Sequence, residues 1–170
     1  MNNKNIRQGR KAKRNGKVFE QYVERSCIRY RRKGIADIKK TPEPMRPVGV
    51  LDQRRGIFKA VYEKKGQPDF LGTLRGGRSV MIEAKHTDAK RIAFDRILSQ
   101  QETDLINTMD LGGLALILIS FELKRFYCIE WFDWQYMKEN IGKKSVNDKD
   151  LAPYEVKLEN GCINFLRGVL

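Results

Sequence analysis

Residues 67–85 constrain the fold of this chain more than any other segment. Two short apolar runs flank a Gly-Gly pair there, which predicts a β-hairpin. Successive side chains of a strand point to opposite faces, so Glu83 and Lys85 share one face and Ala84 lies on the other. The hairpin also returns Asp69 to the same end. Two carboxylates and an amine in one place can hold a divalent cation and orient a water molecule beside a phosphate, which favours phosphodiester hydrolysis.

The composition indicates one folded domain that binds a polyanion. A chain of 170 residues with 41% hydrophobic residues is long enough for one core and short for two. The formal net charge of +13 attracts polyanions, although a basic architectural protein without any chemistry would carry a similar charge. The single histidine excludes histidine-rich metal sites. Three scattered cysteines indicate a reducing compartment, and neither a signal peptide nor a membrane span is predicted.

The N-terminal region divides into a basic arm and a helix. Residues 1–14 are rich in lysine and arginine with almost nothing apolar, and we interpret them as a flexible arm that lies along phosphates. Apolar residues recur at helical spacing over residues 16–33, and Gly34 ends this predicted helix. Glu20 lies in its first turns. Residues 15–170 are then predicted to form a single domain.

A basic insertion follows the first predicted strand, residues 35–39. Residues 40–66 begin with three prolines in six positions, which excludes a helix or a central strand at that point. Further along, basic residues are interleaved with aromatic and β-branched ones. An insertion of this length between two strands is uncommon and usually functional. We therefore predict a protruding, partly β, basic projection, with a floppy surface loop as the alternative.

The rest of the chain alternates helices and strands. Residues 87–97 are predicted to be a polar, basic connection, and Ser99 and Glu102 are spaced as a capping box that opens a helix. The continuously apolar run 114–119 predicts a strand buried on both faces. The remaining predicted elements are a strand over 126–129, a helix over 131–138 and a strand over 162–166. This order favours an α/β fold in which helices lie on the faces of a mixed sheet.

The chain resembles a known nuclease superfamily in its hairpin and its surroundings. Pro68-Asp69 followed by Glu83-Ala84-Lys85 resembles the PD-(D/E)xK motif, and within that superfamily the chain resembles the RecU-type Holliday junction resolvases. The runs that carry the resemblance are Asn15-Gly16-Lys17-Val18-Phe19-Glu20, Ile35 to Pro44, Phe70 to Lys85, and Phe126-Tyr127-Cys128-Ile129-Glu130. It extends from about Asn15 to Leu166, and the compact length suggests a phage-encoded or otherwise trimmed member.

The chain departs from that family in two places. Gln67 stands where the family has a threonine. The segment 86–99 is divergent, so either Gln100 or Gln101 matches the family's site glutamine, and Gln101 is preferred because it keeps its distance to Gly113.

The resemblance implies a fold, a substrate and a cofactor. The implied fold is a restriction-endonuclease-like mixed β-sheet core flanked by helices, with a protruding basic stalk between the first and second core strands. The implied protein is a cytoplasmic homodimer, in a bacterium or a phage-infected host cell, that nicks opposed strands of four-way junction DNA. It would use Mg²⁺ or Mn²⁺ and work beside recombination or branch-migration proteins.

The resemblance also implies the site residues. Asp69, Glu83 and the carbonyl of Ala84 would bind the metal, while Lys85 would orient or deprotonate the attacking water or simply pair with Glu83. The implied catalytic residues are Asp69, Glu83, Lys85, Glu20 and Gln101. The cations implied to bind DNA are Arg10, Lys11, Lys13, Arg14, Lys39, Lys40, Arg46, Arg54, Arg55, Lys59, Lys64 and Lys65.

Two alternatives stay open on the sequence alone. One keeps the nuclease chemistry but acts on linear duplex or other branched DNA. The other is a basic nucleic-acid-binding module without catalysis, in which Glu83 and Lys85 form an ordinary ion pair and Asp69 caps a turn.

Overall fold

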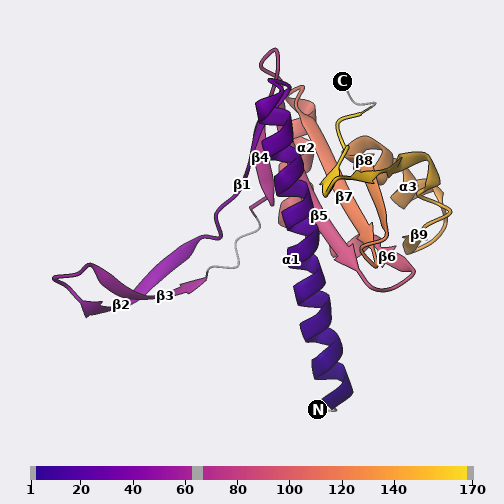
Figure 1. Cartoon of the computed structure of the whole chain (residues 1–170). Coiled ribbons are helices and arrows are strands. Elements are labelled where there is room, and N and C mark those ends of the chain that lie inside the picture. The colour runs from indigo at the N-terminus through magenta and orange to yellow at the C-terminus, as the bar shows by residue number, and fades with distance from the viewer. Residues whose placement is uncertain (1–2, 63–66, 168–170) are drawn as a thin grey trace.

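Six strands form a central mixed sheet in the part of the chain that the computed structural model describes, residues 3–62 and 67–167 (Figure 1). Side chains are described from residue 7 onward. The neighbours β5 and β7 run parallel, and the other neighbouring strands run antiparallel. In order across the sheet, the strands are β1 (Ala36–Lys40), β4 (Phe70–Leu74), β5 (Ser79–Thr87), β7 (Leu114–Phe121), β8 (Arg125–Glu130) and β10 (Glu155–Val156). The predicted α/β fold and its hairpin are confirmed.

One long helix, α1 (Asn3–Arg32), covers one face of the sheet. Its apolar residues, among them Phe19, Val23 and Tyr30, are buried, and the helix packs against β1 and β5. Gly34 ends the helix region with φ at 63°, a conformation that costs glycine little.

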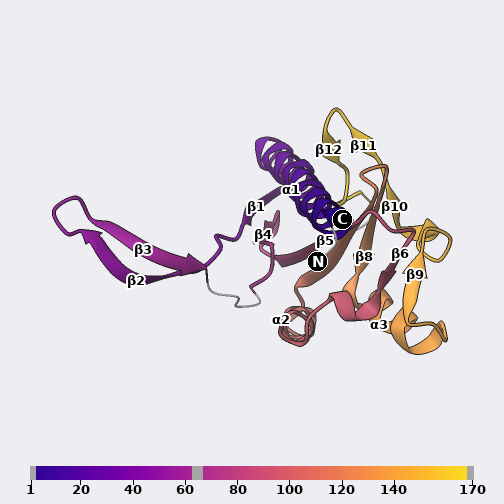
Figure 2. The ribbon, with the colours of Figure 1, turned by 90° about the horizontal axis from the view of Figure 1, so that it is seen from below.

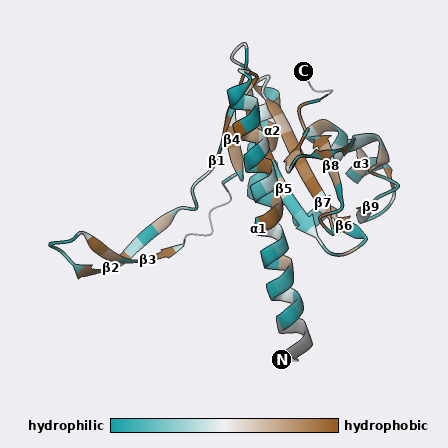
Figure 3. Cartoon of the chain, in the orientation of Figure 1, coloured by the Kyte–Doolittle hydropathy of each residue, from teal (hydrophilic) through white to brown (hydrophobic). Residues whose placement is uncertain are grey.

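The prediction of a flexible arm over residues 1–14 was wrong for the part that the structure describes, because α1 starts at Asn3. Lysine, arginine, glutamine and alanine are good helix formers, and proline is missing from this stretch of sequence. A helix already anchored by Phe19 can therefore extend backwards without a new nucleation cost. The N-terminal turns project beyond the sheet and are largely hydrophilic (Figures 1 and 3).

Two shorter helices, α2 (Ser99–Asp110) and α3 (Trp131–Asn140), lie on the opposite side of the sheet from α1 (Figure 2). Residues 87–97 are more than the predicted polar connection, because Ile92, Phe94 and Ile97 are buried in the core beneath these helices. They belong to β6 (Arg91–Ala93), which pairs with β9 (Ser145–Asn147), and to the short helix η1 (Phe94–Arg96). The strand β7 is buried along its whole length, as predicted.

The predicted cap of α2 is displaced by one residue. The N-cap is Leu98 in an extended conformation, and Gln101, not Glu102, occupies the third helical position. Leucine has no side-chain acceptor, so only half of a capping box forms, in which the Leu98 N–H donates to Gln101 Oε1 at 3.1 Å. This half-box fixes the amide of Gln101 at the start of the helix.

A separate ribbon projects from the sheet between β1 and β4 (Figures 1 and 2). It consists of β2 (Met45–Asp52) and β3 (Ile57–Tyr62), which pair with each other and not with the central sheet. Its side chains are exposed apart from Asp52, which is half-buried.

The C-terminal region closes the α1 side of the core. Its elements are η2 (Ala152–Tyr154), β11 (Leu158–Glu159) and β12 (Cys162–Ile163), so the strand predicted over 162–166 is shorter than expected. Phe165 and Leu166 are nevertheless buried against α1, and Leu166 N–H donates to the Tyr30 hydroxyl. None of the helices in the described residues is long and apolar enough to cross a membrane.

Candidate active site

Asp69 and Ala84 meet where the hairpin ladder ends. The pairing of β4 with β5 stops at Phe70 opposite Ile82. The next N–H of β5 that points toward β4, that of Ala84, therefore has no partner in β4. The carboxylate of Asp69 takes that place and accepts the Ala84 N–H at 2.8 Å. The N–H and C=O of one residue in a strand point to the same side, so the Ala84 carbonyl faces the same edge. The hairpin thus brings Asp69 beside β5, as predicted.

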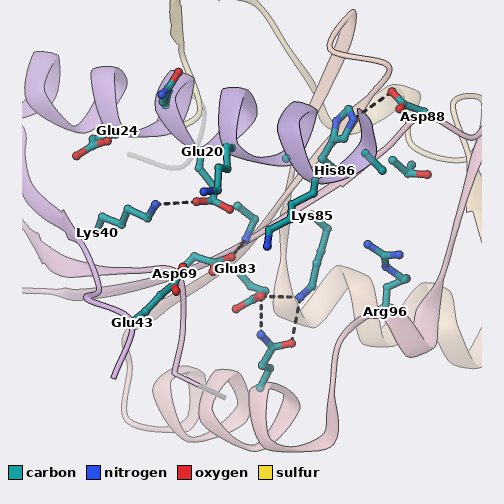
Figure 4. Close-up of a pocket in the computed structure, with 18 residues that line it drawn as sticks. Glu20, Glu24, Lys40, Glu43, Asp69, Glu83, Lys85, His86, Asp88 and Arg96 are labelled. Carbon is teal, nitrogen blue, oxygen red and sulfur yellow. Dashed lines mark hydrogen bonds and ion pairs between the residues drawn. The ribbon is translucent and has the colours of Figure 1, made fainter. Parts of the chain in front are cut away.

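Glu83, Lys85 and Gln101 form a closed hydrogen-bonded triangle (Figure 4). Glu83 Oε1 accepts from Lys85 Nζ at 2.7 Å and from Gln101 Nε2 at 2.6 Å. Lys85 Nζ also donates to Gln101 Oε1 at 3.2 Å. Of the two glutamines left open by the sequence, Gln101 lies in this network, whereas Gln100 is exposed and donates to Asp104 on the surface of α2.

The two carboxylates lie close together, with Glu83 buried and Asp69 half-buried. Burial raises the pKa of Glu83 to about 7, the negative charge of Asp69 adds to this rise, and the Lys85 ammonium opposes it. Burial also raises the pKa of Asp69 above its ordinary value, against the hydrogen bond from Ala84 and the charge of Lys85. Two adjacent carboxylates that both resist ionisation, even with Lys85 beside them, form a site that a further positive charge would stabilise.

This site fits a divalent cation. Glu83 Oε2 is buried and has no hydrogen-bond partner within the described residues. It belongs to one of two adjacent carboxylates, and the Ala84 carbonyl faces the same edge, so three hard oxygens are available. Among the residues described, no cluster of three or more His, Cys, Asp or Glu side chains has metal-binding geometry, so the protein would supply two carboxylates and leave the remaining positions to water and substrate.

Glu20 reaches the same cavity from the opposite wall. It lies on α1 close enough to Asp69 for its charge to raise the Asp69 pKa. Its carboxylate is already paired, because Lys40 Nζ donates to Glu20 Oε2 at 2.7 Å at the end of β1 (Figure 4). The structure therefore places Glu20 at the site but engages it with a predicted DNA-binding lysine.

A cavity of about 710 Å³ contains these groups, with α1 as one wall and β5 with η1 as the other. Among its lining residues are the five predicted catalytic residues, Asp69, Glu83, Lys85, Glu20 and Gln101. It is also lined by His86, Asp88 and Arg96, which sequence reasoning missed. His86 and Asp88 follow Lys85 directly in the sequence, so their proximity to it was available as a signal, whereas Arg96 is brought in only by the fold.

His86 and Asp88 connect α1 to β5 and β7. The imidazole lies between Ser120 Oγ on β7 and Asp88 Oδ1, at 3.2 Å from each. Asn15 of α1 donates to Asp88 Oδ1 at 3.0 Å. Burial lowers the pKa of His86, against the influence of Asp88. This chain of hydrogen bonds holds the helix that carries Glu20 over the end of β5.

The predicted DNA-binding cations that the structure describes lie in four places. Lys13 and Lys40 line the cavity. Lys39 lies on β1, where it pairs with Asp37 at 3.6 Å. Those exposed on the N-terminal turns of α1 are Arg10, Lys11 and Arg14. Those on the β2–β3 ribbon and its turn are Arg46, Arg54, Arg55 and Lys59. Lys64 and Lys65 lie outside the described residues.

Known proteins resemble this chain over most of its length. The sequence model of the family described as recombination protein U (RecU) matches residues 14–169. Proteins named Holliday junction resolvase RecU from two strains of Staphylococcus epidermidis are 28% identical over 169 residues, which cover 91% of this chain and 79% of theirs.

Among solved structures, Hjc from Archaeoglobus fulgidus, a Holliday junction resolvase from an archaeal hyperthermophile, has a TM-score of 0.46 and 12% identity. That match covers 78% of this chain and 91% of Hjc. The family model spans nearly the whole chain, including every residue of the Asp69, Glu83 and Lys85 site, and the chain therefore belongs to the recombination protein U (RecU) family.

Proposed function

We propose that this protein is an endonuclease that resolves four-way (Holliday) DNA junctions as a homodimer, by metal-dependent phosphodiester hydrolysis. The observation that carries the proposal is the group of Asp69, Glu83, Lys85 and Gln101 in one cavity of a RecU-family chain. The relatives named as Holliday junction resolvases support the choice of substrate.

The residues of the cavity divide the work of hydrolysis. The Lys85 ammonium, fixed by Glu83 and Gln101, would hold the attacking water and offset the negative charge that develops on the phosphate. Gln101 holds the side chains of Glu83 and Lys85 in their relative positions, because its side-chain amide hydrogen-bonds to both. Water then attacks phosphorus, one phosphate ester bond breaks, and a proton passes to the leaving oxygen.

Mg²⁺ or Mn²⁺, held by Asp69, Glu83 and the Ala84 carbonyl, would polarise the phosphate and acidify the attacking water. The unpaired Glu83 oxygen and the raised pKa values of both carboxylates support this assignment. Glu20 would contribute from α1 once Lys40 turns to a phosphate.

The ribbon supports a branched substrate. An exposed projection of β2 and β3 that carries arginines and a lysine has no cavity to enter on a linear duplex, whereas an open four-way junction offers one. The paired nicks that resolve a junction require two active sites, and a two-fold symmetric dimer supplies them.

Cleavage and binding assays on one variant test the chemistry. Asp69→Asn removes a metal ligand but keeps the shape of the side chain, so we expect cleavage of a labelled four-way junction in Mg²⁺ to fall by at least about a thousandfold. Junction binding in EDTA should stay at the wild-type level. Asp110→Asn, on an exposed residue at the end of α2, is the matched control and should cut normally.

The outcomes separate the competing functions. Cleavage by Asp69→Asn at the wild-type rate would overturn the site assignment. A wild-type protein that shifts junction DNA but cuts it in neither Mg²⁺ nor Mn²⁺ would be a non-catalytic binding module. Equal or faster cleavage of linear duplex than of junction would keep the nuclease and reject the junction as its substrate.

A further inference from the structure

Arg96 is a cation in the wall of the cavity. Lys40 and Lys85, which line the same cavity, are already paired with Glu20 and Glu83. Arg96 forms neither an ion pair nor a side-chain hydrogen bond with any other residue that the structure describes. In Figure 4, Lys85 lies between Asp69 and Arg96, so the guanidinium is on the side of Lys85 away from the proposed metal ligands.

The backbone that carries Arg96 is rigid although its side chain is exposed. Arg96 is the last residue of η1, between the buried side chains of Phe94 and Ile97. Phe94 packs edge-on against Trp134, with ring centroids 4.9 Å apart. The Phe94 N–H also donates to the carbonyl of Lys144 at 3.2 Å. These contacts anchor the backbone at Arg96, whereas an unpacked surface loop would not.

The position of Arg96 is also tied to the catalytic group. Two residues further on, the backbone N–H of Leu98 donates to Gln101 Oε1. The side-chain Nε2 of Gln101 in turn donates to Glu83 Oε1 at 2.6 Å. The strand β5, the start of α2 and the end of η1 are therefore joined through one glutamine. Phosphates bound at Arg96 and at Lys85 would consequently be held by one connected part of the fold.

A guanidinium in this setting suits a phosphodiester. Its planar set of donors matches two phosphate oxygens at once, and it stays charged at any working pH. The scissile phosphate belongs beside Lys85 and the carboxylates, so the anion within reach of Arg96 is another phosphate of the same strand. We propose that Arg96 binds the phosphate adjacent to the scissile one and so sets which bond of the strand enters the site. This inference rests on the proposed nuclease function.

Neutral-phosphate substrates test the contact directly. Single methylphosphonates, which remove one phosphate charge each, are placed at successive positions on either side of the cleavage point in a four-way junction. With the wild type, we expect cleavage to fall about tenfold for one flanking position, because one charge-assisted contact is lost. Arg96→Ala should cut the unmodified junction about tenfold less efficiently and show no further loss at that position.

Two controls accompany this series. Arg96→Lys keeps the charge but loses the two-pronged geometry, so it should recover part of the rate and cut with less uniform position. Arg75→Ala removes an exposed arginine from the β4–β5 turn, outside the cavity, and should behave as the wild type.

Binding measurements keep this inference separate from the nuclease proposal. In EDTA, the log–log salt slope of junction binding should be shallower by about 0.9 for Arg96→Ala than for the wild type. An unchanged slope, or the same methylphosphonate sensitivity in Arg96→Ala as in the wild type, would overturn the Arg96 contact. A shallower slope in a protein that never cuts would retain the contact and reject the nuclease function.

Discussion

Two antiparallel hairpins follow each other in this chain and have opposite surroundings. The β4–β5 hairpin lies in the central sheet, and its residues Phe70 and Ile82 are fully buried. The β2–β3 ribbon extends away from the sheet, and its large apolar side chains, such as Phe58 and Leu51, are exposed. Both are pairs of antiparallel strands joined by a turn, so the difference between them lies in what each one packs against.

The difference shows how one motif can serve two purposes. Its place in the central sheet allows the β4–β5 hairpin to hold Asp69, Glu83 and Lys85 at hydrogen-bonding distances, in a position where charge interactions are strong. The ribbon has little tertiary packing to hold it in place, and its apolar and basic residues remain available to a ligand. Side chains that must keep exact relative positions need a packed core beneath them, whereas side chains that contact a ligand must be exposed.

A pair of phenylalanine truncations gives the largest contrast. Phe70→Ala should lower the free energy of unfolding by about 3–5 kcal/mol, because it opens a cavity in a closely packed core. Phe58→Ala, whose side chain is 54% exposed, should change it by less than about 0.5 kcal/mol. Urea denaturation of both variants measures the difference. Equal losses would mean that the ribbon packs against something in solution.

A pair of glycine substitutions tests the same contrast through the backbone. A Cβ on Gly72 would lie 2.5 Å from Ile38 Cα and still closer to the Asp37 carbonyl oxygen, so β1 would have to move. We expect Gly72→Ala to cost at least about 2–3 kcal/mol. A Cβ on Gly49 of the ribbon meets nothing within 4 Å in the described part of the chain, and Gly49→Ala should be nearly neutral. Thermal unfolding of the two variants provides the comparison.

Removing the buried acid of the hairpin should change how stability depends on pH. The pKa of Glu83 is raised from 4.5 to about 7 in the folded protein, so the folded state binds the proton more tightly than the unfolded state. The metal-free wild type should therefore be most stable below pH 4.5 with respect to this group. It should lose on the order of 3 kcal/mol as the pH rises to about 7.

Glu83→Gln removes the titrating group and should flatten this dependence. The free energy of unfolding of the variant, relative to the wild type, should therefore be highest at the alkaline end of the range. Unfolding in EDTA buffers across the range measures both proteins. Parallel stability curves for the two would show that Glu83 does not titrate abnormally.

The smallest effect on stability is expected from a charge on the ribbon. Lys59→Ala should leave the free energy of unfolding unchanged within about 0.5 kcal/mol, because surface charges contribute little. It should nevertheless make the salt slope of junction binding shallower by about 0.9. A loss of stability without a change of slope would mean that the ribbon is structural.

Much of the fold and of the site could be predicted from local patterns. The Gly-Gly turn and the apolar runs gave the hairpin, and alternation placed Glu83 and Lys85 on one face. The apolar run that became β7 was identified as buried on both faces. Such patterns are reliable because strand periodicity and turn chemistry are local properties.

Three features escaped prediction for related reasons. The N-terminal turns of α1 have no apolar face, so periodicity gave no sign of a helix that is anchored further along at Phe19. The segment 87–97 looks polar because its few buried residues, Ile92, Phe94 and Ile97, are spread among charged ones. The cap of α2 shifted to Leu98 because Gln101 is held by Glu83, a tertiary contact.

The sequence by itself determined the chemistry of this protein: two carboxylates, an amine and a glutamine at hairpin and helix positions, in a chain whose charge of +13 favours a polyanion. Only the tertiary structure decided how those groups work together. It paired Lys40 with Glu20, left one Glu83 oxygen without a partner among the described residues, and placed Arg96 in the wall of the cavity. Residue types and spacings are local, whereas desolvation and pairing depend on which distant segments pack together.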